Sequence, residues 1–369
     1  MNHFFVTYQI RTTKDNIDEI AEDICLEQTV EVVKNLAQDK WIKENIIGKV
    51  KEITQLSNGV FNVLISYSDA ITGYQLPQLL NILYGNISLK NNIKIVNLSL
   101  SKNFLSHFEG PKFGISSIRK ILNIKDRPLL AAALKPMGKN HEELAQLAYQ
   151  LALGGIDIIK DDHGLVDHSF CSFHKRIKAC QQAIRKAELK TSKKVLYFPN
   201  ITDSYENMLE NIKLAKEIGV GGFLVSPMII GFDLMRYLAN KISTLPIMAH
   251  PAFTGSLFNT KHGISCRIIL GNIMRIAGAD LVIYPNFGGR FPFTKKVCKE
   301  IDEALKKDMF NLKKAFPVPA GGIAFENISK LNKFYGHNVV FLVGSSLYAY
   351  SKNLTESVKY FLCKVNNSV

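Results

Sequence analysis

The sequence lacks the features that mark several classes of protein. The nearest candidate for a membrane span, residues 221–232, contains Pro227 and is shorter than the roughly 18–20 residues that cross a bilayer. The six cysteines include no Cys-x-x-Cys pair, so neither a zinc knuckle nor a disulfide framework is indicated. The first ten residues alternate like a strand and lack the charged-then-apolar order of a signal peptide. We therefore expect a soluble protein of a reducing cytoplasm that makes no membrane contact.

The chain is basic, but its positive charge is not gathered into a nucleic-acid motif. It has 46 lysines and arginines against 32 acidic residues, a formal net charge of +14. The lysines are spread along the whole chain, with no Lys/Arg-rich stretch of five to eight residues and no aromatic-basic RNA-binding signature. A solvated basic surface that attracts small anions is therefore favoured over nucleic-acid binding.

The first hundred residues predict a small α+β domain. At 369 residues the chain exceeds the typical domain of about 150, which allows one large domain or two unequal ones. Alternating apolar residues predict strands near 3–10, 47–53, 59–66 and 93–100, and helical spacing predicts helices at 14–27 and 75–85. The order β-α-β-β-α-β is that of the ferredoxin-like sandwich, which by itself implies no function.

From Arg127 onward the pattern predicts a barrel. Eight short apolar runs alternate with helical stretches, at 129–136, 156–162, 195–200, 221–227, 245–250, 280–286, 316–322 and 339–344. Eight such units over about 240 residues indicate a (β/α)₈ barrel at 126–369, after an N-terminal domain at 1–125. An open doubly wound sheet is the alternative, but no Gly-x-Gly-x-x-Gly follows the first run. Barrel active sites lie at the carboxyl ends of the strands, so functional side chains are expected there.

The second barrel strand ends in a charged sequence, Lys160-Asp161-Asp162-His163. Because strand side chains alternate, Lys160 and Asp162 should point into the barrel mouth and Asp161 away from it. One interpretation is a buried ion pair. The other is a metal site with Asp162 and His163 as ligands and Lys160 either a cation or chemically modified. The first strand ends at Lys135, whose amine beside a metal would have a lowered pKa and move protons.

Other strand ends carry groups that suit an anionic substrate. His250 ends strand five and is either a pocket residue or a structural one. Strands seven and eight end in glycine turns whose backbone amides suit a phosphate, at Gly321-Gly322 and Gly344-Ser345. After strand six, a glycine-hinged loop carries Arg290, which either closes over an anionic substrate or faces solvent.

Taken together, these segments resemble the RuBisCO large subunit, and more closely the RuBisCO-like proteins that do not fix carbon dioxide. The resemblance covers roughly residues 1–350 in the family's order and spacing. Its most specific parts are RPLLAAALKP and GGIDIIKDD. The matching segments are Gly85-Asn86, GPKFGI (110–115), RPLLAAALKP (127–136), GGIDIIKDD (154–162), IMAH (247–250), AGG (320–322) and FLVG (341–344).

The resemblance implies a homodimer whose active site is shared between subunits. The N-terminal domain of one subunit would cover the barrel mouth of the other, with Asn86 and Glu27 reaching that site. Carbon dioxide would carbamylate Lys160, which would then bind Mg²⁺ together with Asp162.

The resemblance also assigns roles to three further residues. Lys135 would match the family lysine that handles the α-proton and the enediolate of the substrate. His250 would line the pocket. Arg290 takes the position in loop six where carboxylases have a lysine.

Departures from the family pattern narrow the expected chemistry. His163 replaces the third, acidic metal ligand, which makes Mn²⁺ or Zn²⁺ more suitable alongside Mg²⁺. Pro251 and Ile283 replace an arginine and a histidine that hold the second phosphate, so a sugar monophosphate is expected in place of a bisphosphate. The resemblance then implies enolisation without carbon dioxide fixation.

Several activities of the family remain open after these departures. The isomerase of 5-methylthioribulose 1-phosphate, an enzyme of sulfur salvage, is favoured. The enolase of 2,3-diketo-5-methylthiopentyl 1-phosphate is an alternative, although it has a lysine base where this chain has Asn86. Decarboxylation of a sugar acid is another. A catalytically silent binding protein is the last, and the retention of Lys135, Lys160 and Asp162 argues against it.

Overall fold

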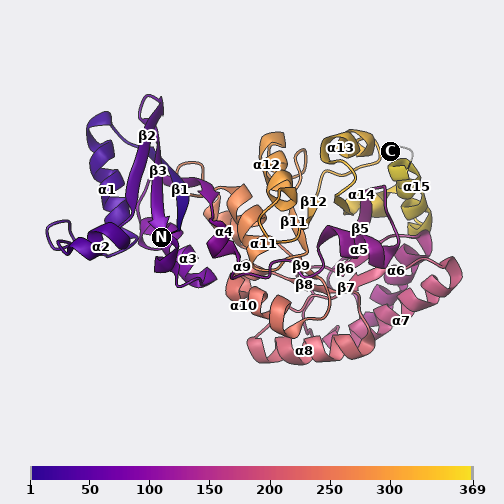
Figure 1. Ribbon diagram of the computed structural model, residues 1–369. Coiled ribbons are helices and arrows are strands. Elements are labelled where there is room, and N and C mark those ends of the chain that lie inside the picture. Colours follow the sequence, from indigo (N-terminus) through magenta and orange to yellow (C-terminus); the bar gives the residue numbers. More distant parts are fainter. Residues whose placement is uncertain (1, 367–369) are drawn as a thin grey trace. The chain divides into compact units, whose positions relative to one another are not determined.

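The computed structural model describes residues 2–366, and the chain divides into two compact units (Figure 1). The N-terminal unit comprises Met1–Glu109 together with two later segments, Phe253–Ile276 and Met309–Leu312. The barrel unit comprises Gly110–Ala252, Ala277–Asp308 and Lys313–Val369. Within residues 2–366, no helix is long and apolar enough to span a bilayer. None of the six cysteines is joined in a disulfide bond.

The N-terminal unit contains a five-stranded sheet in the order β10-β4-β1-β3-β2. Its strands are β1 (His3–Arg11), β2 (Lys49–Ser57), β3 (Val60–Ser68), β4 (Ile93–Ser99) and β10 (Gly263–Ile264). Its helices are α1 (Ile17–Glu27), α2 (Lys40–Asn45), α3 (Leu76–Tyr84), α4 (Lys102–Leu105) and α11 (Met274–Ile276). The antiparallel β4-β1-β3-β2 core confirms the ferredoxin-like prediction. The pattern missed β10, whose two residues pair with β4, and the short α2.

The core of the N-terminal unit follows the two periodicities of its sequence. Strand β1 buries Phe4, Val6, Tyr8 and Ile10 on one face, each at most 1% exposed. Helix α1 buries Ile17, Ala21, Ile24 and Cys25, which recur at intervals of three and four residues. Because both stripes are apolar, the helix and the sheet cover each other and exclude water from between them.

The barrel unit is built on eight parallel strands, as predicted. They are β5 (Leu129–Leu134), β6 (Ile158–Asp161), β7 (Leu196–Phe198), β8 (Phe223–Val225), β9 (Ile247–Ala249), β11 (Leu281–Pro285), β12 (Phe316–Ala320) and β13 (Val340–Val343). The strand order is β7-β6-β5-β13-β12-β11-β9-β8. Hydrogen bonds from Ile201 N to Leu224 O (3.0 Å) and from Leu224 N to Pro199 O (2.9 Å) join β7 to β8 and close the barrel.

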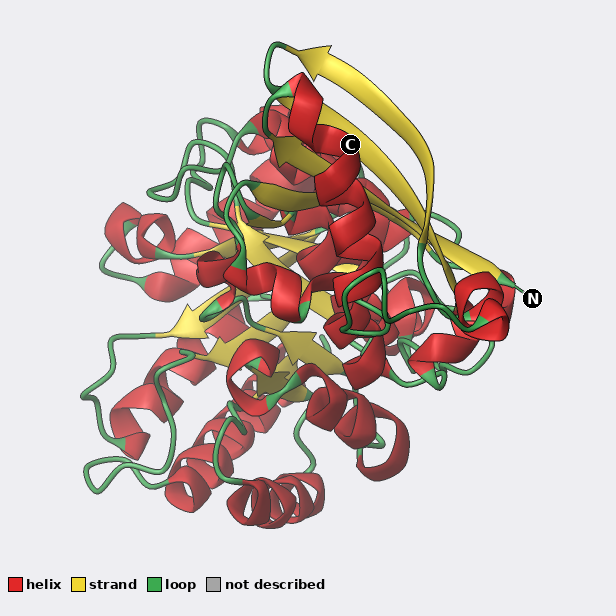
Figure 2. Cartoon of the chain, turned by 90° about the vertical axis from the view of Figure 1, so that its left-hand side faces the viewer, coloured by secondary structure: helices red, strands yellow, loops and turns green. Residues whose placement is uncertain are grey.

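Helices surround these strands, as Figure 2 shows. They are α5 (Gly114–Leu122), α6 (His141–Gly154), α7 (Phe173–Thr191), α8 (Tyr205–Ile218), α9 (Pro227–Ile230), α10 (Phe232–Tyr237), α12 (Lys295–Lys306), α13 (Ile328–Tyr335), α14 (Ser345–Tyr350) and α15 (Leu354–Asn366). Helix α6 begins at a capping box of Asn140 and Glu143 and ends at Gly155, whose φ is +91°. Helix α5 packs with the first residues of several strands, including Leu129 and Phe316, which closes the amino end of the barrel.

The barrel interior is apolar over most of its length. One buried cluster takes residues from all eight strands, among them Ala131 of β5, Ile158 of β6 and Met248 of β9. Lys160 follows Ile158 at the strand period of two and therefore points to the same, interior side. Asp161 points outward, as predicted, because its carboxylate pairs with Arg176 of α7.

At the amino end of β6, the preceding residue Asp157 forms a buried ion pair with Arg127. Two guanidinium nitrogens of Arg127 donate to its carboxylate at 2.7 Å, and so does the backbone N–H of Leu130. The side chain of Asp157 is 3% exposed and that of Arg127 is 19% exposed. The pair joins the start of β5 to the start of β6. It therefore lies at the amino ends of these strands, opposite to the carboxyl ends where the site is expected.

We expect Asp157→Asn to lower the free energy of unfolding by about 2–4 kcal/mol, because it leaves a mostly buried guanidinium without its counter-charge. Urea unfolding followed by circular dichroism measures this loss. Asp126→Asn, at an exposed neighbour, is the control and should change stability by less than about 0.5 kcal/mol. Equal stability of the two variants would contradict the role of the pair.

Candidate active site

The carboxyl ends of four neighbouring strands gather most of the predicted site. The paired residues Ala320 and Leu342, Val343 and Ala132, and Leu134 and Asp161 place β12, β13, β5 and β6 side by side with their ends at one edge. The residues that follow these strands therefore succeed one another around the barrel mouth. They are Gly321-Gly322, Gly344-Ser345, Lys135 and Asp162.

Lys160 is a buried amine at the mouth of the barrel. It is 2% exposed, and its Nζ donates to the carbonyl oxygen of Asp161 at 2.8 Å. Burial, assisted by the positive charge of Lys135, lowers its pKa to about 8, although Asp162 and Asp161 act in the opposite direction. A pKa of about 8 leaves roughly a tenth of the amine neutral at pH 7, and the neutral form is the nucleophilic one.

Asp162 lies between the two lysines and His163. Its Oδ2 is 3.5 Å from Nζ of Lys135, and its Oδ1 accepts from Nδ1 and from the backbone N–H of His163, both at 2.7 Å. Partial burial raises the pKa of this carboxyl, but the His163 hydrogen bond and the charges of Lys135 and Lys160 outweigh burial and hold it well below its usual range. The group is therefore an ionised oxygen ligand at neutral pH.

Two histidines from distant strands stack at the mouth. The rings of His163, after β6, and His250, after β9, have centroids 4.3 Å apart and an interplanar angle of 9°. Because Nδ1 of His163 donates to Asp162, Nε2 of the neutral ring keeps a free lone pair. Of the two interpretations of His250, structural residue or pocket residue, this geometry supports the pocket.

His250 is held as a neutral imidazole. Its Nδ1 accepts from the backbone N–H of Ala252 at 3.1 Å, which assigns the ring proton to Nε2. Burial, assisted by the positive charge of Lys160, lowers its pKa well below the usual value. Its Nε2–H is therefore a hydrogen-bond donor that stays neutral, suited to an oxygen on which negative charge develops.

The two predicted phosphate turns are neighbours. Gly321 and Gly322 have φ of +84° and +65°, and a Cβ on Gly322 would lie 2.7 Å from the backbone nitrogen of Gly289, so only glycine fits there. Gly344 precedes α14, which begins at Ser345, and Oγ of Ser346 donates to the carbonyl of Ile323 at 2.6 Å. Phosphate binding by these turns stays a prediction.

The structure does not bring Arg290 to the lysine cluster. It lies on an exposed part of the loop after β11, and its described contact is with the ring of Phe291, 5.1 Å from its guanidinium carbon. Arg290 faces solvent in this structure, and closure of its loop over an anionic substrate stays a prediction.

The N-terminal unit pairs the two residues expected to serve a partner subunit. Nδ2 of Asn86, in the turn after α3, donates to Oε1 of Glu27 at 2.9 Å and to Oε1 of Glu31 at 3.0 Å. Glu27 is the last residue of α1. The sequence resemblance placed Asn86 and Glu27 together, but it did not identify Glu31.

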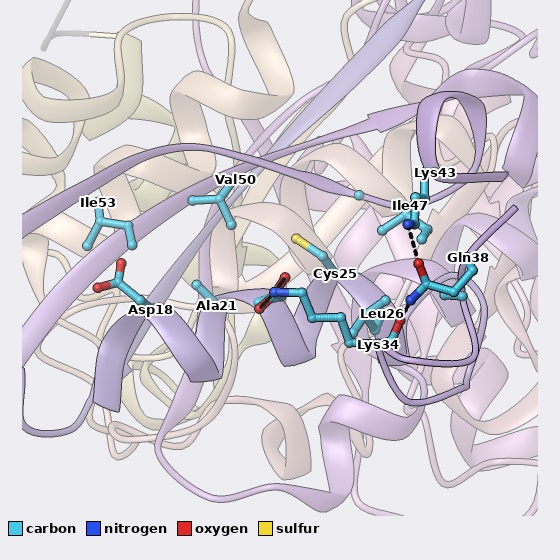
Figure 3. A pocket seen from close by; sticks show the side chains of 13 residues that line it. Asp18, Ala21, Cys25, Leu26, Lys34, Gln38, Lys43, Ile47, Val50 and Ile53 are labelled. Carbon is cyan, nitrogen blue, oxygen red and sulfur yellow. Dashed lines mark hydrogen bonds and ion pairs between the residues drawn. The ribbon is translucent and has the colours of Figure 1, made fainter. Parts of the chain in front are cut away.

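A cavity of about 590 Å³ in the N-terminal unit lies elsewhere (Figure 3). It is lined by α1, by β2 and by the segment between them, with Cys25 and Ile53 among its apolar residues. An ion pair of Lys34 with Glu22 (2.6 Å) lies at its edge. None of the predicted site residues lines this cavity, so it is not where the family chemistry is expected.

Sequence reasoning missed the buried polar residues behind β6. Asp161 accepts hydrogen bonds from Arg176, Tyr197 and the backbone of Asn200. One signal was available, because Arg176 falls on the apolar face of α7 between Phe173 and Ile177. An arginine at such a position needs a buried acceptor.

The side chains at the mouth include two candidate metal ligands, and a third would require chemical modification of Lys160. Within residues 2–366, no group of three His, Cys, Asp and Glu side chains is arranged to hold a metal ion. Asp162 offers a carboxylate and His163 a free Nε2. Lys160, with its lowered pKa, is the neighbouring amine that a carbamate would convert into an oxygen ligand. The residues therefore fit a divalent ion once Lys160 is carbamylated.

Known proteins of one family are similar to this chain over most of its length. The model of the ribulose bisphosphate carboxylase large chain, catalytic domain, matches residues 114–354. Ribulose bisphosphate carboxylase-like protein 1 of Rhodopseudomonas palustris is 36% identical over 98% of this chain and 96% of its own length. A crystal structure of a Rubisco-like protein from Rhodopseudomonas palustris superposes with a TM-score of 0.90 at 33% identity, covering 100% of this chain and 98% of the other.

Two relatives carry the names of enzymes. A 5-methylthioribulose-1-phosphate isomerase of Rhodospirillum rubrum is 32% identical, over 97% of this chain and 95% of its own length. A 2,3-diketo-5-methylthiopentyl-1-phosphate enolase of Bacillus pumilus is also 32% identical, over 98% of this chain and 91% of its own length. The chain therefore belongs to the RuBisCO large-chain family, in its branch of RuBisCO-like proteins.

Proposed function

We propose that this protein is a metal-dependent enzyme that enolises a sugar monophosphate and does not fix carbon dioxide. Its substrate would be 5-methylthioribulose 1-phosphate and its reaction an isomerisation. The observation that carries the proposal is the convergence of Lys135, Lys160, Asp162, His163 and His250 at one end of the barrel. A buried amine, an ionised carboxylate and a neutral imidazole donor are the groups that proton abstraction next to a carbonyl requires.

A divalent ion, Mg²⁺ or Mn²⁺, would be held by the carbamate of Lys160, by Asp162 and by His163. When bound, such an ion polarises a carbonyl and its neighbouring hydroxyl and so acidifies the hydrogen between them. Mixed oxygen and imidazole ligands suit Mn²⁺ better than a site of oxygen ligands alone. Carbon dioxide is then a component of the site and not a substrate.

The protein's own residues would move the proton and stabilise the charge. Lys135, whose Nζ lies 3.5 Å from Oδ2 of Asp162, would take the proton from the carbon beside the carbonyl and return it to another carbon. The neutral Nε2–H of His250 would donate to the enediolate oxygen. Because the proton leaves one carbon and returns to another, the product is an isomer and no co-reactant is consumed.

The polarity of the surroundings supports a substrate with one phosphate. The adjacent glycine turns after β12 and β13 would bind it through backbone N–H groups. Ile283 belongs to the apolar interior cluster and is 2% exposed, so it offers no group to a second phosphate. An apolar methylthio group is compatible with the end of the site at Ile283. The net charge of +14 favours attraction of the anionic substrate.

We further propose a homodimer in which Asn86 and Glu27 serve the site of the partner subunit. Their side chains already form one hydrogen-bonded pair in the N-terminal unit, together with Glu31. The enolase reaction on 2,3-diketo-5-methylthiopentyl 1-phosphate is the second candidate, supported by the identity to an enolase. Asn86 at the position of the enolase lysine base favours the isomerase.

Incubation with 5-methylthioribulose 1-phosphate in D₂O should bring solvent deuterium into carbons next to the carbonyl, observed by NMR. Lys160→Ala and Lys160→Arg should both abolish exchange, because neither a methyl group nor a fixed cation replaces a carbamate. Lys175→Ala, at an exposed lysine of α7, is the matched control and should retain activity. Exchange with the diketo substrate alone would favour the enolase, and absence of exchange with both would end the methylthio proposal.

Carbamylation of Lys160 should increase with pH, because only the neutral amine reacts with carbon dioxide. Carbamate formation from the neutral amine and carbon dioxide releases one proton. With a pKa of about 8 for Lys160, a carbamate signal in ¹³C NMR at fixed dissolved ¹³CO₂ should therefore rise steeply up to pH 8 and less steeply above it until the site is full. Below pH 8 the neutral amine falls by about tenfold per unit of pH. Lys160→Arg should lack this signal. A signal that persists in the variant, or one that grows as pH falls, would contradict the assignment.

His163→Glu tests the contribution of the imidazole to metal choice. Restoring an acidic ligand should raise the affinity for Mg²⁺ relative to Mn²⁺ by about tenfold, because carboxylates favour the harder ion. Titration of each ion by calorimetry in the presence of bicarbonate measures the ratio. His174→Glu, at an exposed position of α7, controls for added charge. An unchanged ratio in His163→Glu would remove His163 from the ligand set.

A further inference from the structure

We infer that Asp161 is the positioning residue for the turn that carries Asp162 and His163. Its carboxylate is fully buried on the outer side of β6, away from the barrel interior. It accepts from Arg176 Nε at 3.1 Å, from Tyr197 OH at 2.7 Å and from the backbone N–H of Asn200 at 3.1 Å. Asp161 therefore fixes side chains of α7 and of β7, and the loop after β7, around a single charge.

Arg176 and Asn200 extend this arrangement to the loop after β6. Nη1 of Arg176 donates to the carbonyls of Val166 at 2.8 Å and Cys171 at 3.1 Å. Nδ2 of Asn200 donates to the carbonyls of His163 at 2.9 Å and Leu165 at 3.1 Å. Four carbonyls between residues 163 and 171, in a segment without helix, are thus held by two side chains. Asp161 pairs with the guanidinium of Arg176 and accepts from the backbone N–H of Asn200.

Electrostatics explains why the carboxylate is required. Asp161 and Arg176 are both 0% exposed at their side chains, so each charge would be unpaired in a medium that solvates it poorly if the other were removed. Without the carboxylate, the guanidinium would turn toward other acceptors, and its bonds to the loop would be lost with it. A buried ion pair of this kind contributes geometry more than stability.

Asp157, four residues earlier, provides a matched control. It is also a buried aspartate paired to an arginine, and its carboxylate also accepts a backbone N–H. It lies at the amino end of β6, however, and its partners do not belong to the loop after the strand. A variant there should cost stability without moving the turn of Asp162 and His163.

The inference rests on the proposed function only in taking Asp162 and His163 as metal ligands. The experiment therefore measures two quantities in the full chain. Hydrogen exchange of the backbone amides of residues 162–172, without metal, reports the order of the loop. Mn²⁺ titration with bicarbonate present reports the ligand geometry. Asp161→Asn, Asn200→Ala and Asp157→Asn are each measured at the same interval below their own melting temperature.

Asp161→Asn should speed exchange in residues 162–172 by about tenfold. It should weaken Mn²⁺ binding by about tenfold or more, as loss of an orienting partner does in other metal sites. Asn200→Ala keeps Asp161 and removes the bonds to the His163 and Leu165 carbonyls, together with the bond that Oδ1 accepts from the backbone N–H of Thr202. It should speed exchange in residues 163–165 by about threefold. Asp157→Asn should change both quantities by less than about twofold.

Equal behaviour of Asp161→Asn and Asp157→Asn in both measurements would overturn the inference. If Asp161→Asn does not fold, Asn200→Ala decides, and exchange no faster than that of Asp157→Asn refutes it. If the unaltered protein binds no Mn²⁺, the proposed function fails, whereas the exchange rates still test whether Asp161 orders the loop.

Discussion

A lysine amine enclosed by an apolar barrel cannot remain an ordinary cation, and the rest of the site follows from that constraint. Lys160 is in phase with Ile158 of the interior cluster and is 2% exposed. Burial lowers its pKa to about 8, so the amine is within reach of neutralisation or modification near physiological pH. The charges of Lys160 and Lys135 in turn shift the pKa values of the neighbouring groups at the barrel mouth.

The neighbouring groups are separated into distinct protonation states. The His163 hydrogen bond and the charges of Lys135 and Lys160 hold the pKa of Asp162 well below its usual value. Burial, with the charge of Lys160, lowers the pKa of His250 well below its usual value. At neutral pH, a carboxyl with a lowered pKa is an anion, whereas an imidazole with a lowered pKa is neutral. Burial and the charges at the mouth together leave Asp162 an anionic oxygen donor and His250 an uncharged hydrogen-bond donor. That separation is what an enolising site requires.

The strands and their facing were predictable from the sequence because both depend on short-range periodicity. Alternation in Lys160-Asp161-Asp162 was enough to assign one lysine to the interior and one carboxylate to the helices. The stacking of His163 on His250 was not predictable, because the two residues come from β6 and β9, which are not neighbours in the sheet. The pairing of β10 with β4 was not predictable either, because a strand of two residues shows no periodicity in its sequence.

The two ends and the two faces of strand β6 have different roles. At its amino end, the pairing of Asp157 with Arg127 joins two strands and touches nothing at the mouth. At its carboxyl end, the inward residue Lys160 is available for chemistry, while the outward residue Asp161 orders the loop that follows. The reactive and the positioning groups are adjacent in sequence but on opposite faces. A strand achieves this arrangement with consecutive residues, whereas a helix would place them on overlapping faces.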